Sequence, residues 1–376
     1  MKKYNQLLLL LILPVIGVAQ KNVPTDNLME KGLDSFVHKT VMPFISQPSK
    51  VGLSIGIYKF DETYTYNYGT TQIDKQILPT DKTIYEIGSI SKTFLGTLLA
   101  QAVKDQKVKM NDDIRLYLES SYPNLEYKGN PIRLFHLVSH ISGLPFFMPD
   151  QPELFKNPNY DSLPFVISRI QQNYSKEKFL SDLHSVKLDT VPGFNFHYSN
   201  AGAQLLKFIL EKVYNKPLDK ILDININRPL LMINTNSIFS KNNTKQLARG
   251  YSEKGNLMPY NPQLLDAAGG IYSTVSDMIS YLKFHLDESN EVVSMSHRVT
   301  TGNIKEYAVG LNWQEQLTSR RQKKIWQSGG TFGFSSYCVI YPELKIAIVM
   351  LTNESDQRAQ GEMEEMANKL FEKINR

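Results

Sequence analysis

Hydrophobic residues recur with two different periods near the start of the chain. Residues 51–60 (VGLSIGIYKF) and 63–68 are rich in apolar, β-branched and aromatic residues, and Asp61-Glu62 separates them. Two such runs with a short polar break predict a β-hairpin. From residue 91 to residue 103 the apolar positions recur every three or four residues. This spacing predicts a helix that is buried along one side.

The rest of the chain is helical first and strand-forming afterwards. Residues 105–255 show helical stretches interrupted by prolines, among them an amphipathic helix at 205–213. Strand patterns return at residues 307–314, 323–327, 335–341 and 345–351, and a helical face at 363–374 ends the chain.

Strands at both ends with helices between them predict one sheet assembled from the two ends of the chain. We therefore expect an α/β (α+β) fold, in which a mixed antiparallel sheet flanked by helices is built from N- and C-terminal segments. The expected α/β domain comprises residues 24–104 and 256–376, and residues 105–255 form a mostly helical inserted domain.

The first 19 residues are typical of a secretory signal peptide. Lys2 and Lys3 precede an apolar run at residues 7–18, and small residues up to Ala19 provide a cleavage site. The run is too short for the roughly 20 residues of a membrane-spanning helix. We therefore expect a periplasmic or secreted protein with no stable membrane anchor.

Composition and charge exclude several classes of protein. The 376 residues are 41% hydrophobic and 21% charged, which is ordinary for a globular chain. The single cysteine, Cys338, leaves no intrachain disulfide and no multi-thiolate metal site. Lys and Arg exceed Asp and Glu by 42 − 37 = 5, too small a surplus to indicate a nucleic acid partner. The one basic cluster, residues 320–324, lies between two predicted strands and is typical of a turn.

Two short motifs in the chain do not indicate catalysis. Residues 52–56 match the G-x-S-x-G nucleophile elbow, but Ser54 lies inside a predicted strand and not at a turn between a strand and a helix. His136 and His140 are four apart on a predicted helix face, as zinc ligands can be. The residue after His136 is Leu137, not the glutamate of an H-E-x-x-H metalloprotease. We expect both histidines to be structural.

A third motif, Ser89-Ile90-Ser91-Lys92, has the form S-x-x-K and opens the buried helix at residue 91. Residues three apart on a helix are neighbours, so Lys92 should lie beside Ser89. The start of a helix favours developing negative charge, and a lysine withdrawn from water can act as the base that a serine nucleophile needs.

Two downstream segments carry further candidates. Tyr198-Ser199-Asn200 precedes the helix at 205–213, where Asn200 could also be no more than an N-cap. Gln327-Ser328-Gly329-Gly330 follows a predicted strand. Glycines there would let a ligand approach the backbone, although a hairpin without a role has the same composition.

These three motifs, in this order, resemble those of the penicillin-recognising serine enzymes of the class C β-lactamase type. Residues 132–145 (IRLFHLVSHISGLP) and 268–274 (AGGIYST) also resemble that family, and the similarity extends from about residue 30 to the C-terminus. The nearest group contains D,D-carboxypeptidases, endopeptidases, D-aminopeptidases and related esterases. The resemblance implies a small-molecule or peptide substrate and neither a metal nor an organic cofactor.

The resemblance also implies roles for individual residues. Ser89 would form the acyl-enzyme, and Lys92 and Tyr198 would share the role of base. Asn200 would bind the substrate amide and orient Lys92. The backbone N–H groups of Ser89 and Gly330 would form the oxyanion hole, and Ser328 and Gly329 would contact substrate from the third motif.

The chain departs from the family at Gln327, where the third motif usually begins with Lys or His. Loss of that cation removes a charge-assisted hydrogen bond to a substrate carboxylate, worth on the order of 1 kcal/mol. Gln327 therefore argues against an efficient β-lactamase and leaves open a peptidase, amidase or esterase whose substrate has no carboxylate there. The interpretation that agrees best with the resemblance is a D,D-peptidase or amidase. An esterase with the same site and a non-catalytic peptidoglycan-binding relative remain alternatives.

We expect residues 146–190 to form loops and short helices near the pocket.

Overall fold

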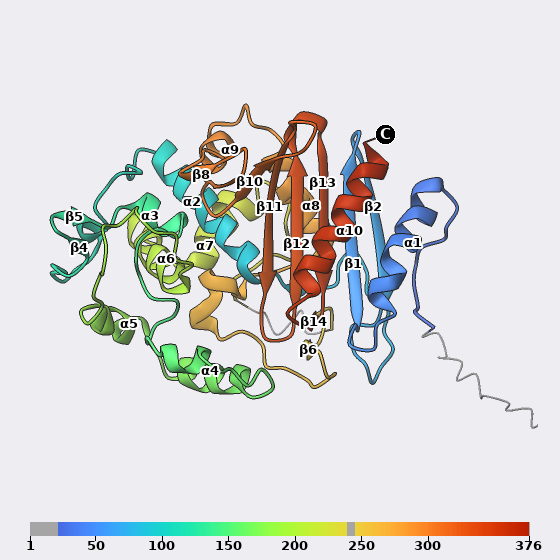
Figure 1. The fold of residues 1–376 in the computed structure, drawn as a ribbon, viewed down its shortest axis with the longest axis horizontal. Helices are drawn as coiled ribbons and strands as arrows, with labels where there is room; N and C mark the ends of the chain where they lie inside the picture. The colour runs from blue at the N-terminus through green and yellow to red at the C-terminus, as the bar shows by residue number, and fades with distance from the viewer. Residues whose placement is uncertain (1–21, 239–244, 376) are drawn as a thin grey trace, which may run out of the picture.

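The computed structural model describes residues 22–238 and 245–375, so the predicted signal peptide lies outside the described residues. Its main feature is an eight-stranded antiparallel sheet with the strand order β2-β1-β13-β12-β11-β10-β9-β8 (Figure 1). Two of these strands come from the start of the chain and six from its end. The predicted sheet of N- and C-terminal segments is confirmed.

The sheet strands are β1 (Gly52–Lys59), β2 (Glu62–Gly69), β8 (Thr301–Asn303), β9 (Tyr307–Val309), β10 (Gln314–Leu317), β11 (Lys323–Gly330), β12 (Ser335–Tyr341) and β13 (Ile346–Thr352). Two-residue strands pair elsewhere: β3 (Tyr85–Glu86) with β7 (Tyr272–Ser273), β4 (Glu126–Tyr127) with β5 (Asn130–Pro131), and β6 (Tyr251–Ser252) with β14 (Glu354–Ser355). The helices are α1 (Gly32–Ile45), α2 (Ser91–Lys104), α3 (Leu134–Val138), α4 (Leu163–Gln172), α5 (Lys176–Leu183), α6 (Asn200–Tyr214), α7 (Leu218–Leu222), α8 (Val275–His285), α9 (Glu291–Ser296) and α10 (Ala359–Ile374).

Helices cover both faces of the sheet, and this explains why the central strands β12 and β13 are buried along their whole length. Along β1, Leu53, Ile55 and Ile57 point into the core that α1 and α10 close. Gly56 and Tyr58 face the other side, where Val275 and Ile279 of α8 pack against Gly56. Each face of the pleat thus has its own hydrophobic core. In Figure 1 the C-terminal helix α10 crosses in front of the sheet.

The region between β3 and β7 is mostly helical, as predicted, and it lies beside the sheet edge (Figure 1). Among its described residues it contains α2 to α7, and its strands there are the two-residue β4, β5 and β6. The proposed boundaries at residues 104 and 255 stay a prediction. No helix among the described residues is long and apolar enough to span a bilayer.

One predicted strand is wrong in its extent. Residues 307–314 form two antiparallel strands, β9 and β10, and not a continuous one. The chain reverses because Asn312 has a left-handed backbone, with φ of +62°. Gly310 is packed so closely that a Cβ atom there would lie 2.6 Å from the carbonyl oxygen of Ser296. The strand pattern continued across this turn because its residues are apolar and buried.

Strand β11 packs directly against the turn that precedes α2, and two glycines make this possible. A Cβ atom on Gly329 would lie 2.3 Å from the carbonyl oxygen of Ile87 and 2.7 Å from the backbone nitrogen of Ser89. A Cβ atom on Gly88, whose φ is +53°, would lie 2.4 Å from the backbone nitrogen of Gly330. The hydroxyl of Ser336 on β12 donates to Ile87 O at 2.8 Å and closes the contact.

Gly329→Ala should therefore destabilise the protein by about 1–3 kcal/mol, because the added methyl group overlaps backbone atoms that have no room to move. The matched control is Gly361→Ala on α10, where a Cβ atom meets nothing within 4 Å. That change should be neutral or stabilise the helix by up to about 1 kcal/mol. Urea unfolding of the two variants checks this, and equal midpoints would contradict the close approach.

Candidate active site

Ser89 lies in a short 3-10 turn, η1 (Gly88–Ile90), that runs directly into α2. Its hydroxyl oxygen has two side-chain partners. Lys92 Nζ donates to Ser89 Oγ at 3.1 Å, and the phenol of Tyr198 donates to the same oxygen at 2.5 Å. Residues from the first two motifs, 109 positions apart at Ser89 and Tyr198, therefore meet at one oxygen atom.

Lys92 is completely buried at the first turn of α2. Its ammonium group contacts Ser89 Oγ and the carbonyl oxygen of Ala268, and it lies 4.9 Å from the centre of the Tyr198 ring. Burial disfavours the charged form and lowers the pKa of Lys92 to about 7. A substantial fraction of the side chain is consequently an uncharged amine at neutral pH, able to accept a proton.

Tyr198 is held by aromatic packing just before α6. Its ring centre is 4.2 Å from that of His140 and 6.2 Å from that of Phe146. Burial raises the pKa of Tyr198, so the phenol stays protonated over the physiological range. The two partners of Ser89 Oγ thus differ in kind: Lys92 can give up its proton readily, and Tyr198 keeps its own.

His140 supports this arrangement without adding charge. Its Nδ1 accepts from the backbone N–H of Ser199 at 3.2 Å, and burial, with Lys92 nearby, lowers the pKa of His140 to about 3. His136 lies in α3, but His140 follows the end of that helix in a left-handed conformation. The predicted shared helix face for the two histidines is therefore wrong, whereas their structural character agrees with their hydrogen bonds.

Asn200 is the first residue of α6 and is buried. The N-cap is Ser199, whose hydroxyl accepts from Gly202 N–H at 2.8 Å, so the N-cap reading of Asn200 is wrong. The backbone N–H of Asn200 donates to Phe146 O at 2.9 Å. Among the described residues the carbonyl of Ala268, and not Asn200, is the second partner of Lys92, so the orienting role of Asn200 stays a prediction.

The third motif forms the end of β11 beside Ser89. The sequence suggested that the motif follows a strand. Because β11 extends to Gly330, the motif is instead part of the strand. Ser328 is half-buried and Gly330 is exposed. The backbone nitrogens of Ser89 and Gly330 belong to the two segments that Gly88 and Gly329 bring into contact: a Cβ atom on Gly88 would lie 2.4 Å from Gly330 N, and one on Gly329 would lie 2.7 Å from Ser89 N.

Gln327 is buried, and both the nitrogen and the oxygen of its amide are hydrogen-bonded to protein groups. Its Nε2 donates to Asn312 O at 2.6 Å, and its Oε1 accepts from Gln314 Nε2 at 2.8 Å and from Ser328 N at 2.9 Å. The position where the family usually carries a cation is here a neutral amide that faces the protein.

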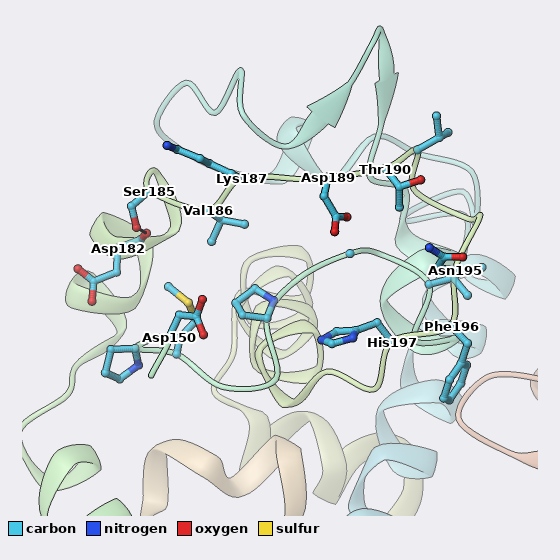
Figure 2. Close-up of a pocket in the computed structure, with 16 residues that line it drawn as sticks. Asp150, Asp182, Ser185, Val186, Lys187, Asp189, Thr190, Asn195, Phe196 and His197 are labelled. Carbon is cyan, nitrogen blue, oxygen red and sulfur yellow. Dashed lines mark hydrogen bonds between the residues drawn. The ribbon is translucent and has the colours of Figure 1, made fainter. Parts of the chain in front are cut away.

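A cavity of about 770 Å³ is lined in part by residues 195–197, which directly precede Tyr198 in the chain (Figure 2). Residues from 141–150 and 182–197 line it, and three of them, Asp150, Asp182 and Asp189, are acidic. His197, next to Tyr198 in the chain, forms part of its wall. Ser89, Lys92 and Tyr198 do not line this cavity, so the expected location of residues 146–190 beside the catalytic pocket stays a prediction. The segment includes α4 and α5.

Sequence reasoning missed two residues that touch the cluster. Ala268 contributes only its carbonyl oxygen, which no side-chain pattern can reveal. Asn312, whose Nδ2 donates to the carbonyl oxygen of Lys92 at 2.8 Å, was hidden inside a predicted strand. Its left-handed turn is the signal that would have revealed it, but that turn is visible only in the structure.

Comparison with known proteins shows the family of the chain. The sequence model of a family described as Beta-lactamase matches residues 26–371. The chain belongs to the Beta-lactamase family. It is 26% identical to a β-lactamase of Escherichia coli K12 over 86% of this chain and 89% of the relative. It is 25% identical to the D-alanyl-D-alanine-carboxypeptidase/endopeptidase AmpH of the same organism, over 86% of this chain and 85% of the relative.

Solved structures show the same fold. A β-lactamase/D-alanine carboxypeptidase from Yersinia pestis superposes with a TM-score of 0.76 at 23% identity, covering 91% of this chain and 99% of the other. A class C β-lactamase from Rhodobacter sphaeroides gives 0.76 at 20% identity, covering 91% and 100%. The predicted membership of this family of serine hydrolases is confirmed, and so is the fold.

The lowered pKa of Lys92 predicts how acylation of this Beta-lactamase family chain depends on pH. The rate of covalent modification at Ser89 by a reactive fluorophosphonate should rise with pH through a midpoint near 7, because only the uncharged amine accepts the serine proton. Gel-based labelling rates between pH 5 and 9 measure it. A rate that is flat across this range, or that rises only near pH 10, would contradict the assignment of Lys92 as a neutral base.

Proposed function

We propose that the chain hydrolyses an amide or ester bond through an acyl-enzyme formed on Ser89. The observation that carries this proposal is the meeting of Lys92 Nζ and Tyr198 OH at Ser89 Oγ. A serine hydroxyl is a weak nucleophile until a neighbouring base takes its proton. In this site the groups that can take, hold and return that proton lie within hydrogen-bond reach.

The pKa shifts divide the base role between the two partners. Uncharged Lys92 takes the proton of Ser89 as Oγ attacks the carbonyl carbon, because its pKa is lowered to about 7. Tyr198, which stays protonated, then gives its proton to the leaving group as the bond to the acyl carbon breaks, and Lys92 returns a proton to the phenolate. In deacylation water replaces the leaving group and the protons move in the opposite direction.

The backbone amides of Ser89 and Gly330 are suited to stabilise the negative charge on the carbonyl oxygen. They belong to two segments in close backbone contact, since a Cβ atom on Gly88 would lie 2.4 Å from Gly330 N. Losing one donor of this kind typically lowers the rate by roughly 10²–10³. Asn200 and Ser328 would hydrogen-bond the substrate beside them.

The substrate class that fits best is a D-amino-acid or cell-wall peptide, with β-lactams as reactive analogues. The relatives include a β-lactamase and a D-alanyl-D-alanine-carboxypeptidase/endopeptidase. The neutral, internally bonded Gln327 provides no cation for a substrate carboxylate. This argues against an efficient β-lactamase and leaves a peptidase or amidase whose substrate has no carboxylate at that place.

An esterase is the second candidate, and the same observation supports it. An ester of a small acyl group needs no carboxylate contact, so Gln327 does not handicap it. A non-catalytic peptidoglycan-binding relative is disfavoured, because Ser89, Lys92 and Tyr198 are all retained and in contact. Export to the periplasm or beyond rests on the leader sequence and stays a proposal.

The experiment that tests the catalytic proposal compares the mature protein with Ser89→Ala. Wild type should form a covalent adduct with a fluorescent penicillin or a fluorophosphonate, seen by mass spectrometry, and the variant should form none. Hydrolysis of p-nitrophenyl acetate, nitrocefin and a muropeptide ending in D-alanine then separates esterase, β-lactamase and peptidase. Equal behaviour of wild type and Ser89→Ala would refute a serine acyl-enzyme.

A further inference from the structure

Asn312 occupies an unusual place between the nucleophile helix and the third motif. It lies in the turn between β9 and β10, is only 3% exposed, and has a φ of +62°. Asparagine is one of the few residues other than glycine that adopt this left-handed conformation readily. The conformation directs its backbone and its side chain towards different elements of the fold.

The hydrogen bonds of Asn312 join three parts of the site. Its Nδ2 donates to the carbonyl oxygen of Lys92 at 2.8 Å, and its backbone N–H donates to Val138 O, at the end of α3, at 2.8 Å. Its own carbonyl oxygen accepts from Gln327 Nε2 at 2.6 Å. The two side-chain hydrogen bonds, from Asn312 to Lys92 and from Gln327 to Asn312, are called the clasp below.

The clasp lies where α2 is packed closely against the turn between β9 and β10. A Cβ atom on Gly96, one turn after Lys92, would be 2.3 Å from the carbonyl oxygen of Leu311. The turn before Asn312 therefore presses on α2 while the clasp holds the backbone of Lys92. Strand β11, through Gln327, is tied to the same point.

We propose that Asn312 is a positioning residue which, through this clasp, keeps the amine of Lys92 in its water-excluded position beside Ser89 Oγ. This inference rests on the proposed acyl-enzyme function and goes beyond it, because it gives the neutral Gln327 a task that does not involve the substrate. The residue at the start of the third motif holds the base in place through Asn312.

The surroundings of Lys92 explain why its position matters. The groups that face its Nζ are Ser89 Oγ, the Tyr198 ring and the carbonyl oxygen of Ala268. His140 nearby is neutral at physiological pH. Asp266, two residues before Ala268 in the chain, is an acidic group that is paired with Lys207 at 2.8 Å.

Because desolvation is the sole cause of the lowered pKa of Lys92, this shift depends on packing and not on a neighbouring cation. If the first turn of α2 loosens, water reaches the amine and its pKa returns towards the ordinary lysine value of 10.5. A residue that only stabilised the fold would leave this titration unchanged.

The test is Asn312→Gly, which keeps the left-handed backbone and removes only the side-chain bond to Lys92. The pH midpoint for fluorophosphonate labelling of Ser89 should rise by at least one unit. The rate at pH 7 should then fall about fivefold or more, because the uncharged fraction of the amine drops from about one half to about one eleventh. At pH 9 the rate should recover most of the way to wild type.

The matched control is Asn215→Gly, at the exposed end of α6, where the asparagine is also left-handed with a φ of +49°. This variant should leave the midpoint unchanged. Gln327→Met, which removes the other bond of the clasp, should shift the midpoint in the same direction and decides the matter if Asn312→Gly does not fold.

An unchanged midpoint in a folded Asn312→Gly, or an equal shift in Asn215→Gly, would overturn the positioning role. Failure of the proposed function gives a different result, namely wild type that is labelled no more than Ser89→Ala at any pH.

Discussion

The site depends above all on the removal of Lys92 from water. A lysine whose pKa falls from 10.5 to about 7 has lost roughly 5 kcal/mol of preference for its charged form, at about 1.4 kcal/mol per pKa unit. The fold bears this cost because α2 is buried along almost its whole first three turns. Ala268 O and Ser89 Oγ supply the hydrogen bonds that remain to the amine.

Close packing near Lys92 also places the third motif, at the end of β11, beside Ser89. Gly329 and Gly88 let β11 approach the Ser89 turn to a distance that no side chain would permit. The same constraint places the amides of Ser89 and Gly330 on facing segments. Strand β11 contributes Ile325 to one hydrophobic core and Trp326 to the other, and Gln327 of the same strand bonds to Asn312 and Gln314 inside the protein.

The sequence predicted the elements whose signals are local. The hairpin at 51–68, the buried helix from residue 91 and the pairing of Ser89 with Lys92 follow from periodicity and from helix geometry. The meeting of Tyr198 with Ser89 was implied only by resemblance, because no local pattern relates residues 109 positions apart. The partners of Gln327 and the turn at Asn312 depend on tertiary packing, which overrides the strand propensity of residues 307–314. Roles towards substrate stay predictions for all the site residues.

The most direct test of a dry, neutral Lys92 is its own titration. Protein labelled with ¹³C at the ε-carbon of lysine gives one NMR signal per lysine, and loss of one signal in Lys92→Arg assigns Lys92. The account predicts a midpoint near pH 7 for that signal, well below those of the exposed lysines. A midpoint near 10 would show that Lys92 is charged at neutral pH and would contradict its role as the base.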